Sequence, residues 1–346
     1  MTKADGSVLG RVNRRHALAA GLVLPWTRLA RAEGRGGSVD ARARWLAGLS
    51  PADGAEDPGE WGAYAAAQEQ RWREIEPRRK AMTDWSSRQI APLLPPGASL
   101  FYPFAGPDAL HALALFGPVK RMMLVGLEPV GTLPELGRAA PGYFKRLGGA
   151  LDDVFRLTFF RTREMSADFE KDGVLAALVV TIIRSGGTIA KVTTTRAEAV
   201  RIDWTHADGQ GRQLEYFRMD LANAALMRHE AFLADVRAAA PVVTFVKAAM
   251  YLLAESRFSR SRQMILEDSA VVVQDDTGVP FRHFDSRWAM RFFGRYDTPV
   301  TPFEERAQPD LRSAFERGGA MPMPFGLGYH VRPDRSNLII ASKGSR

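Results

Sequence analysis

The sequence contains no cysteine, and several other features that would define a class of function are missing as well. Without cysteine the chain has no disulfides, no thiolate metal ligands and no cysteine nucleophile. Its histidines are isolated and form no His-Glu-x-x-His motif, and there is no Gly-x-Ser-x-Gly elbow, Ser-x-x-Lys pair or Walker loop. Motifs therefore leave any catalytic residues unknown, and the sequence identifies no cofactor.

Long apolar runs are also missing. The longest covers residues 174–183, which is about half of the ~20 residues that a membrane-spanning helix needs. This run predicts a buried helix instead. With 346 residues, of which 46% are hydrophobic, the chain is long enough to bury a full core.

Positive charge is concentrated at the N-terminus and scattered elsewhere. Residues 1–32 hold six basic side chains and one acid, so they carry five of the eight net positive charges. The remaining arginines form no stripe or cluster of the kind that nucleic-acid binding requires. We therefore expect no nucleic-acid partner.

The first 32 residues resemble a twin-arginine signal peptide. Arg14 and Arg15 form the pair, a short apolar region follows at residues 19–26, and Ala30-Arg31-Ala32 is a small-x-small cleavage site. The resemblance implies the twin-arginine export machinery as a partner, cleavage near Ala32 and a periplasmic location. The apolar region is too short for a membrane anchor to be retained after cleavage.

Residues 33–97 predict a helical N-terminal region, and residues 98–346 predict an α/β domain. Within the first part, residues 60–90 carry an apolar stripe at helical spacing, and the Pro-rich segment at 92–97 ends it. The second part predicts a mixed, partly parallel sheet with flanking helices, because several of its strands are continuous apolar runs.

The stretch 99–131 predicts a Rossmann-like βαβ unit. An aromatic, apolar run ends in a turn at residues 103–108, a helix follows with Asp108 as its N-cap, and a second apolar run ends at Glu128. Gly106 stands in the turn and Glu128 comes about 20 residues later, which is the spacing of nucleotide sites in which an acid binds ribose hydroxyls.

The segment Phe104-Ala-Gly-Pro-Asp108 resembles the first motif of Rossmann-type methyltransferases. It has one glycine where that motif has two or three, and Pro107 lacks an N–H that could bind a phosphate or carboxylate. The alternative interpretation is a βαβ corner in which Gly106 and Pro107 only make the turn.

The rest of the chain adds a hairpin, two buried strands and a helix. Residues 199–204 and 213–219 alternate apolar and polar positions around a Gly-rich link, which predicts an antiparallel hairpin. Residues 242–246 and 270–273 predict buried strands. We expect residues 247–253 to continue from the first of these as a helix.

Two adjacent carboxylates, Asp275 and Asp276, follow the second buried strand. Asp276-Thr-Gly278 matches the triplet of aspartic proteases, but the chain has no second copy of it. The pair could also bind Mg²⁺ or Ca²⁺, provided a turn lets both side chains reach one ion. The third interpretation is a turn in which both aspartates accept hydrogen bonds from nearby backbone amides.

Three segments together resemble a family of uncharacterised bacterial exported proteins: Tyr102-Pro-Phe-Ala-Gly-Pro-Asp108, Leu124-Val-Gly-Leu-Glu128-Pro and Gln274-Asp-Asp-Thr-Gly-Val-Pro280. The resemblance implies export and supplies no mechanism. We expect a periplasmic binding or accessory module with a cleft for a small ligand near residues 104–108 and 274–280. The candidate ligand-binding residues are Tyr102, Gly106, Asp108, Glu128, Asp275 and Asp276.

The alternative is an enzyme, either a carboxylate- or metal-dependent hydrolase or a transferase on a nucleotide-binding fold. In either case the two segments should meet, because the carboxyl ends of parallel strands open on one edge of a sheet. Acids brought together there need a cation or a shared proton, or at least one raised pKa.

Overall fold

The computed structural model describes residues 37–50, 58–156, 165–195 and 198–344. The signal-peptide residues Arg14, Arg15, Ala30 and Ala32 lie outside this part of the chain. Among the described residues, no helix is both long enough and apolar enough to cross a membrane.

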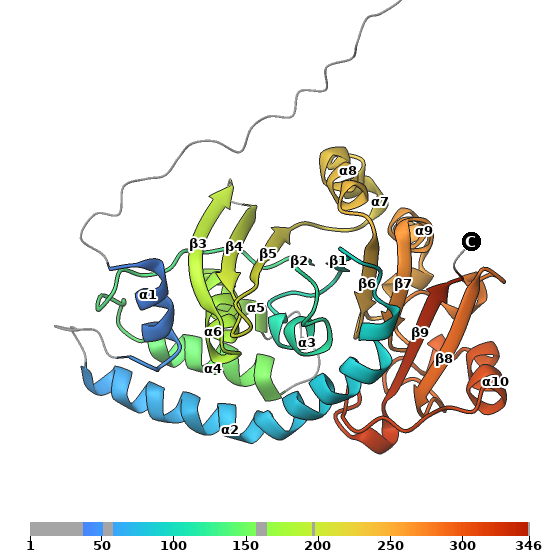
Figure 1. Cartoon of the computed structure of the whole chain (residues 1–346), viewed down its shortest axis with the longest axis horizontal. Helices are drawn as coiled ribbons and strands as arrows, with labels where there is room; N and C mark the ends of the chain where they lie inside the picture. The colour runs from blue at the N-terminus through green and yellow to red at the C-terminus, as the bar shows by residue number, and fades with distance from the viewer. Residues whose placement is uncertain (1–36, 51–57, 157–164, 196–197, 345–346) are drawn as a thin grey trace, which may run out of the picture. The chain divides into compact units, whose positions relative to one another are not determined.

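The described residues form one nine-stranded sheet, in the order β3-β4-β5-β2-β1-β6-β7-β9-β8 (Figure 1). The strands are β1 (Ser99–Tyr102), β2 (Arg121–Gly126), β3 (Thr188–Thr195), β4 (Ala199–Thr205), β5 (Gly211–Arg218), β6 (Val242–Val246), β7 (Ser269–Gln274), β8 (Trp288–Gly294) and β9 (Asn337–Lys343).

The middle of the sheet is parallel and its two ends are antiparallel. Strands β5, β2, β1, β6 and β7 pair in parallel, whereas β3 and β4 at one end and β9 and β8 at the other pair antiparallel. The predicted α/β class with a mixed, partly parallel sheet is therefore confirmed. The predicted hairpin is β4 and β5, and the sequence did not reveal β3, which extends it by one polar strand.

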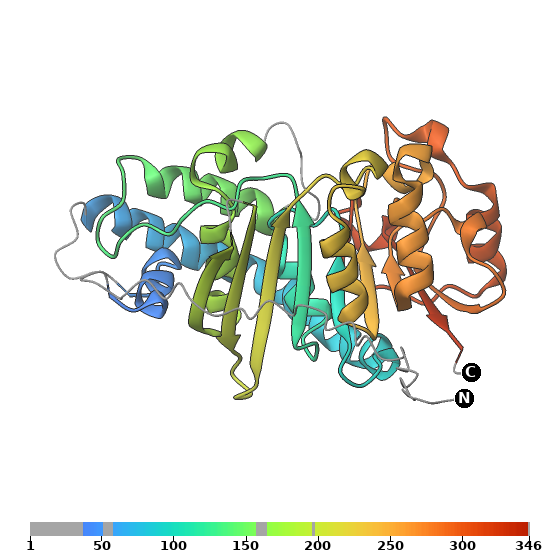
Figure 2. The same cartoon turned by 90° about the horizontal axis from the view of Figure 1, so that it is seen from above.

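Helices flank both faces of the sheet (Figures 1 and 2). They are α1 (Val39–Leu46), α2 (Pro58–Gln89), α3 (Ala109–Leu115), α4 (Tyr143–Arg156), α5 (Met165–Asp172), α6 (Leu175–Arg184), α7 (Asn223–Leu226), α8 (Glu230–Ala238), α9 (Ser259–Asp268) and α10 (Pro309–Arg317).

The central strands β1, β2, β6 and β7 contribute to the cores on both faces, because successive side chains point to opposite faces and most of them are apolar. Leu100 and Tyr102 of β1 point into the core that α1, α2, α3, α4 and α6 cover, while Phe101 points into the core that α8 and α9 cover. Helix α6 is buried along nearly its whole length, as its continuous apolar run predicts.

The N-terminal helical region shares a core with the sheet. Helix α2 runs without interruption through Pro77 and packs on α3 and α4. Near its end, the ring of Trp85 contacts Phe293 edge-on at 4.9 Å and Phe325 at 5.4 Å. The helices before residue 97 therefore pack on the α/β core that follows them.

One predicted helix is absent, and its absence shapes the site. Residues 247–251 form a loop after β6 in place of the expected helix, with Ala248, Met250 and Tyr251 in the left-handed region at φ 48°, 50° and 54°. Only a short 3-10 turn, Leu252–Ala254, follows. The hydrogen bonds that hold this loop come from residues far along the chain.

Candidate functional site

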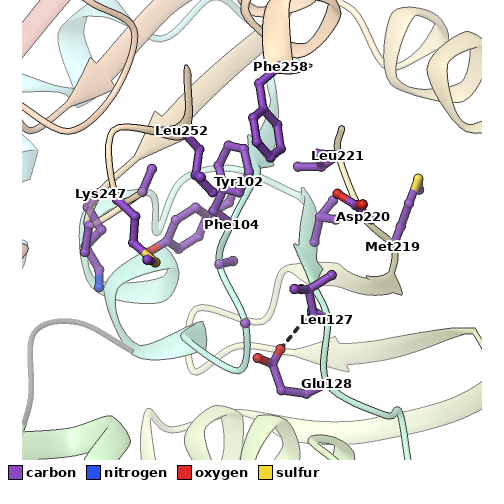
Figure 3. Close-up of a pocket in the computed structure, with 17 residues that line it drawn as sticks. Tyr102, Phe104, Leu127, Glu128, Met219, Asp220, Leu221, Lys247, Leu252 and Phe258 are labelled. Carbon is purple, nitrogen blue, oxygen red and sulfur yellow. Dashed lines mark hydrogen bonds between the residues drawn. The ribbon is translucent and has the colours of Figure 1, made fainter. Parts of the chain in front are cut away.

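A pocket of about 130 Å³ opens at the carboxyl ends of the parallel strands (Figure 3). It is lined by residues 102 and 104–106 at the end of β1, 125–128 at the end of β2, 219–221 after β5 and 247–250 after β6, together with Leu252 and Phe258. Four separate segments of the chain therefore build one cavity. A dry cavity of about this size holds a six-membered ring in other proteins.

The pocket lies where the strand order reverses. From β1 the chain crosses through α3 to β2 on one side, whereas β6 is added later on the other side of β1. The loops after β1 and β6 consequently diverge and leave a crevice at the edge of the sheet. In open α/β sheets, ligands bind in such a crevice.

Two glycines, Gly106 and Gly126, allow the turn after β1 to approach the end of β2 closely at the pocket. Gly106 has φ 54°, and the amides of Ala105 and Gly106 donate to the carbonyl of Val125 at 2.7 and 3.3 Å. A Cβ on Gly126 would lie 2.8 Å from the Cα of Gly106 and 2.5 Å from a carboxylate oxygen of Glu128. Both positions therefore require glycine.

The walls are largely apolar. Phe104 and Phe258 meet edge-on with ring centroids 5.8 Å apart, and Phe104 itself has φ 59°. Leu127 and Met250 also line the pocket and are 55% and 41% exposed, although large apolar side chains are usually buried. These two side chains give the pocket an apolar rim that solvent reaches.

Glu128 places a buried carboxylate at one end of this apolar space, below Leu127 in Figure 3. Its Oε2 accepts hydrogen bonds from the amide of Leu127 and the hydroxyl of Tyr216, each at 3.1 Å. Burial raises the pKa of Glu128, and these hydrogen bonds partly oppose the rise. The carboxylate is thus held in place by two protein donors and faces the cavity.

Asp108 lies beside the pocket at the centre of a buried polar network. Its Oδ2 accepts from the hydroxyl of Tyr102 at 2.7 Å and from the ammonium of Lys247 at 2.9 Å, and its Oδ1 lies 2.8 Å from Nδ1 of His111. The Asp108 side chain also accepts from the His111 amide, which makes it the N-cap of α3, as predicted.

The pKa values of two groups in this network, Asp108 and His111, lie far from their ordinary values. Burial alone would raise the pKa of Asp108, but hydrogen bonds from His111 and Tyr102 and the ammonium of Lys247 outweigh it and hold that pKa well below its usual range. Burial lowers the pKa of His111 to about 4, so the ring is neutral near pH 7 and its Nδ1–H donates to Asp108. The charged pair is therefore Asp108 and Lys247, which joins the loop after β1 to the loop after β6.

Asp275 and Asp276 do not line the pocket. Asp275 accepts from the amides of Ala248 at 2.8 Å and Thr277 at 2.9 Å, and Asp276 accepts from the hydroxyl of Tyr251 and the side-chain amide of Asn337. Burial, reinforced by Asp276, raises the pKa of Asp275 to about 7, and burial likewise raises that of Asp276.

Some of the expected residues therefore line the pocket, and others do not contact the cavity. Tyr102, Gly106 and Glu128 line the cavity; Asp108 lies next to it, and Asp275 reaches only the loop residue Ala248, which does line it. Strands β1 and β7 point the same way with β6 between them, so the turns at Gly106 and Gly278 open on the same edge of the sheet. Among the described residues, no group of three or more metal-ligating side chains is assembled.

Sequence reasoning missed some of the residues that line the pocket and identified others only in part. Asp220 follows β5 directly, and an acid after a predicted strand was a usable signal. The sequence singled out Lys247 as a charge after a buried strand and a possible partner for an acid, without indicating that this acid is Asp108. Phe104 belongs to the expected cleft segment, but Met250 and Phe258 have no local signal, because nothing in the sequence separates them from core residues.

Comparisons with protein-family models, curated proteins and solved structures give no match to this chain. The function therefore has to be argued from the pocket itself.

Proposed function

We propose that this protein is an exported small-molecule-binding module with Rossmann-like architecture, and that its ligand contains a nucleoside. The observation that carries the proposal is the pocket at the carboxyl ends of β1 and β6, where the strand order reverses. This is the place where open α/β sheets bind nucleotides and related ligands.

The strand order supports the Rossmann-like part of the proposal. Taken in chain order, the parallel strands β5-β2-β1-β6-β7 read 3-2-1-4-5, the order of doubly wound nucleotide-binding sheets. Residues 104–108, in the turn after the first of these strands, also resemble the first motif of Rossmann-type methyltransferases. Because one fold serves many functions, the ligand has to be argued from the side chains.

The side chains favour a nucleoside over a phosphorylated ligand. Glu128 offers a carboxylate to ribose hydroxyls, and the apolar walls suit the flat face of a base. No arginine is among the described residues that line the pocket, the ammonium of Lys247 is bonded to Asp108, and Pro107 has no N–H to donate. A phosphate would therefore meet two carboxylates, Glu128 and Asp220, and little positive charge.

The first test is binding of adenosine, S-adenosylmethionine and NAD to the full chain. We expect native mass spectrometry or calorimetric titration to show one bound molecule of a nucleoside without phosphates, and weaker binding of NAD. Glu128→Gln should weaken adenosine binding about tenfold to a hundredfold, since a hydrogen bond to a charged group contributes about 1.5–3 kcal/mol.

Glu316→Gln is the matched control, because Glu316 is exposed on α10 and does not line the pocket. It should bind adenosine like the wild type. If none of the three compounds binds or co-purifies, or if NAD binds more tightly than adenosine, the nucleoside assignment is wrong.

The same purified protein can distinguish an enzyme from a binding module. A transferase would convert bound S-adenosylmethionine to S-adenosylhomocysteine in the presence of an acceptor, whereas a binding module would return it unchanged. The hydrolase alternative has less support, because Asp275 and Asp276 are buried, engaged in hydrogen bonds and not among the residues that line the pocket.

Export is tested by fractionation. We expect the double variant Arg14→Lys, Arg15→Lys to accumulate in the cytoplasm as a precursor, because the twin-arginine pathway recognises the arginine pair and not its charge alone. Arg11→Lys, which makes the same chemical change outside the pair, should be exported normally. Periplasmic accumulation of the double variant at the wild-type level would rule out use of the pair.

A further inference from the structure

The loop of residues 247–251, which forms one wall of the pocket, has a backbone conformation that is unfavourable by itself. Ala248, Met250 and Tyr251 all have φ near 50°, a left-handed region that is unfavourable for residues with a Cβ. Ala248 and Met250 line the pocket. A loop of this shape persists only where its surroundings fix it.

Three of the contacts that fix the loop come from the turn after β7, and the hydroxyl of Tyr329 also donates to the carbonyl of Ala248 at 3.1 Å. Oδ2 of Asp275 accepts from the amide of Ala248 at 2.8 Å, and Oγ1 of Thr277 accepts from the amide of Ala249 at 2.7 Å. Asp276 accepts from the hydroxyl of Tyr251. Three consecutive side chains thus hold three positions of the loop.

The turn itself is anchored to the sheet. Thr277 donates through its hydroxyl and its amide to Oδ1 of Asp275 at 2.5 and 2.9 Å. Asn337, the first residue of β9, accepts from the amide of Asp276 at 2.8 Å and donates to its Oδ1 at 2.9 Å. All of these side chains are almost completely buried. Water therefore does not compete for the bonds that reach the loop.

We propose that Asp275, Asp276 and Thr277 form a clasp that sets the shape of the ligand pocket. The clasp acts through the backbone of residues 248–251 and contacts no ligand, so its members are positioning residues. This inference rests on the proposed ligand-binding function. It also gives the two carboxylates a role other than hydrolysis or metal binding: one carboxylate holds a backbone amide of the loop, and the other holds a tyrosine.

The test removes one hydroxyl from the clasp and measures the loop directly. In Thr277→Val, the amides of Ala248 and Ala249 should exchange with deuterium at least tenfold faster than in the wild type, and adenosine affinity should fall about tenfold. Thr277→Ser restores the hydroxyl and should return both values to the wild-type level. Tyr251→Phe removes the bond to Asp276 and gives a second route to the same result if Thr277→Val does not fold.

Thr181→Val is the matched control. Thr181 is equally buried, and its hydroxyl bonds the carbonyl of Ala177 within α6, away from the pocket. Its exchange rates at residues 248–249 and its adenosine affinity should equal those of the wild type.

The exchange measurement needs no ligand, so it separates this inference from the proposed function. Wild-type protein that fails to bind adenosine contradicts the proposed function, and the exchange rates still decide whether the clasp holds the loop. Unchanged exchange at Ala248 and Ala249 in both Thr277→Val and Tyr251→Phe would overturn the clasp. Faster exchange without loss of adenosine affinity would show that the loop does not set the pocket.

Discussion

Asp108→Ala should lower the free energy of unfolding by about 3–5 kcal/mol, the usual cost of removing one member of a buried ion pair. The variant leaves the ammonium of Lys247, which is only 4% exposed, without its carboxylate. It also removes the acceptor for Tyr102 and the N-cap of α3. Urea unfolding followed by tryptophan fluorescence and circular dichroism would measure the loss.

Two further variants show whether charge is the cause. Asp235→Ala removes a carboxylate that is paired with Arg121 at the surface, and it should cost less than about 1 kcal/mol. The double variant Asp108→Asn, Lys247→Met should be more stable than Asp108→Ala, because it no longer buries a charge. A loss for Asp108→Ala no larger than that for Asp235→Ala would contradict the assignment of a buried pair.

Asp275→Asn should change how stability depends on pH. The pKa of Asp275 is raised from 3.8 to about 7 by burial and by Asp276, so the folded state keeps a proton that the unfolded state releases. The stability contributed by this proton is full below pH 4 and is lost as the pH rises through 7. Between pH 5 and pH 8 the wild type should therefore lose about 3 kcal/mol relative to Asp275→Asn, at about 1.4 kcal/mol per pH unit over the two units below the folded-state pKa.

The measurement is the free energy of unfolding of both proteins at pH 5 and pH 8. Groups that do not interact with Asp275 cancel in the difference between the two proteins; His111, whose pKa is lowered to about 4, shifts stability in the opposite direction but does so in both. Asp276 titrates together with Asp275, so the difference reports the pair of carboxylates. Asp310→Asn, at an exposed position on α10, should follow the wild-type profile. Parallel profiles for the wild type and Asp275→Asn would show that Asp275 is ionised at both pH values.

Local signals in the sequence predicted the parts of the fold that depend on local chemistry. The alternation of β4 and β5, the continuous apolar run of α6 and the N-cap of α3 at Asp108 each follow from a few neighbouring residues. Pro77 did not end α2, because packing on α3 and α4 holds the helix on both sides of it.

The failures have a common physical cause in contacts between distant parts of the chain. Residues 247–253 have the composition of a helix, yet Asp275 and Thr277 bind the amides of Ala248 and Ala249 and hold them in a loop. Strand β3, with four threonines, is a strand because β4 pairs with it.

In the candidate site, too, features that depend on neighbouring residues could be predicted, and features that depend on distant segments could not. The spacing of Gly106 and Glu128 could be seen in the sequence, and both line the pocket. The pair of Asp108 with Lys247 could not be predicted, because it requires β6 to lie beside β1. The clasp from Asp275 to Ala248 likewise depends on the pairing of β6 with β7.

Because β1 lies between β2 and β6, the centre of the sheet can form only after β6 has been synthesised. Ser99 pairs with Arg121 on one side and with Val242 on the other. Until β6 is synthesised, more than a hundred residues after β2, the nascent chain carries β1 with the backbone N–H and C=O groups of one edge unpaired. Such an edge can pair with other chains, and non-local parallel pairing is slow. The ribosome-bound chain thus passes through a long interval in which aggregation competes with folding, and chaperones would act on it there.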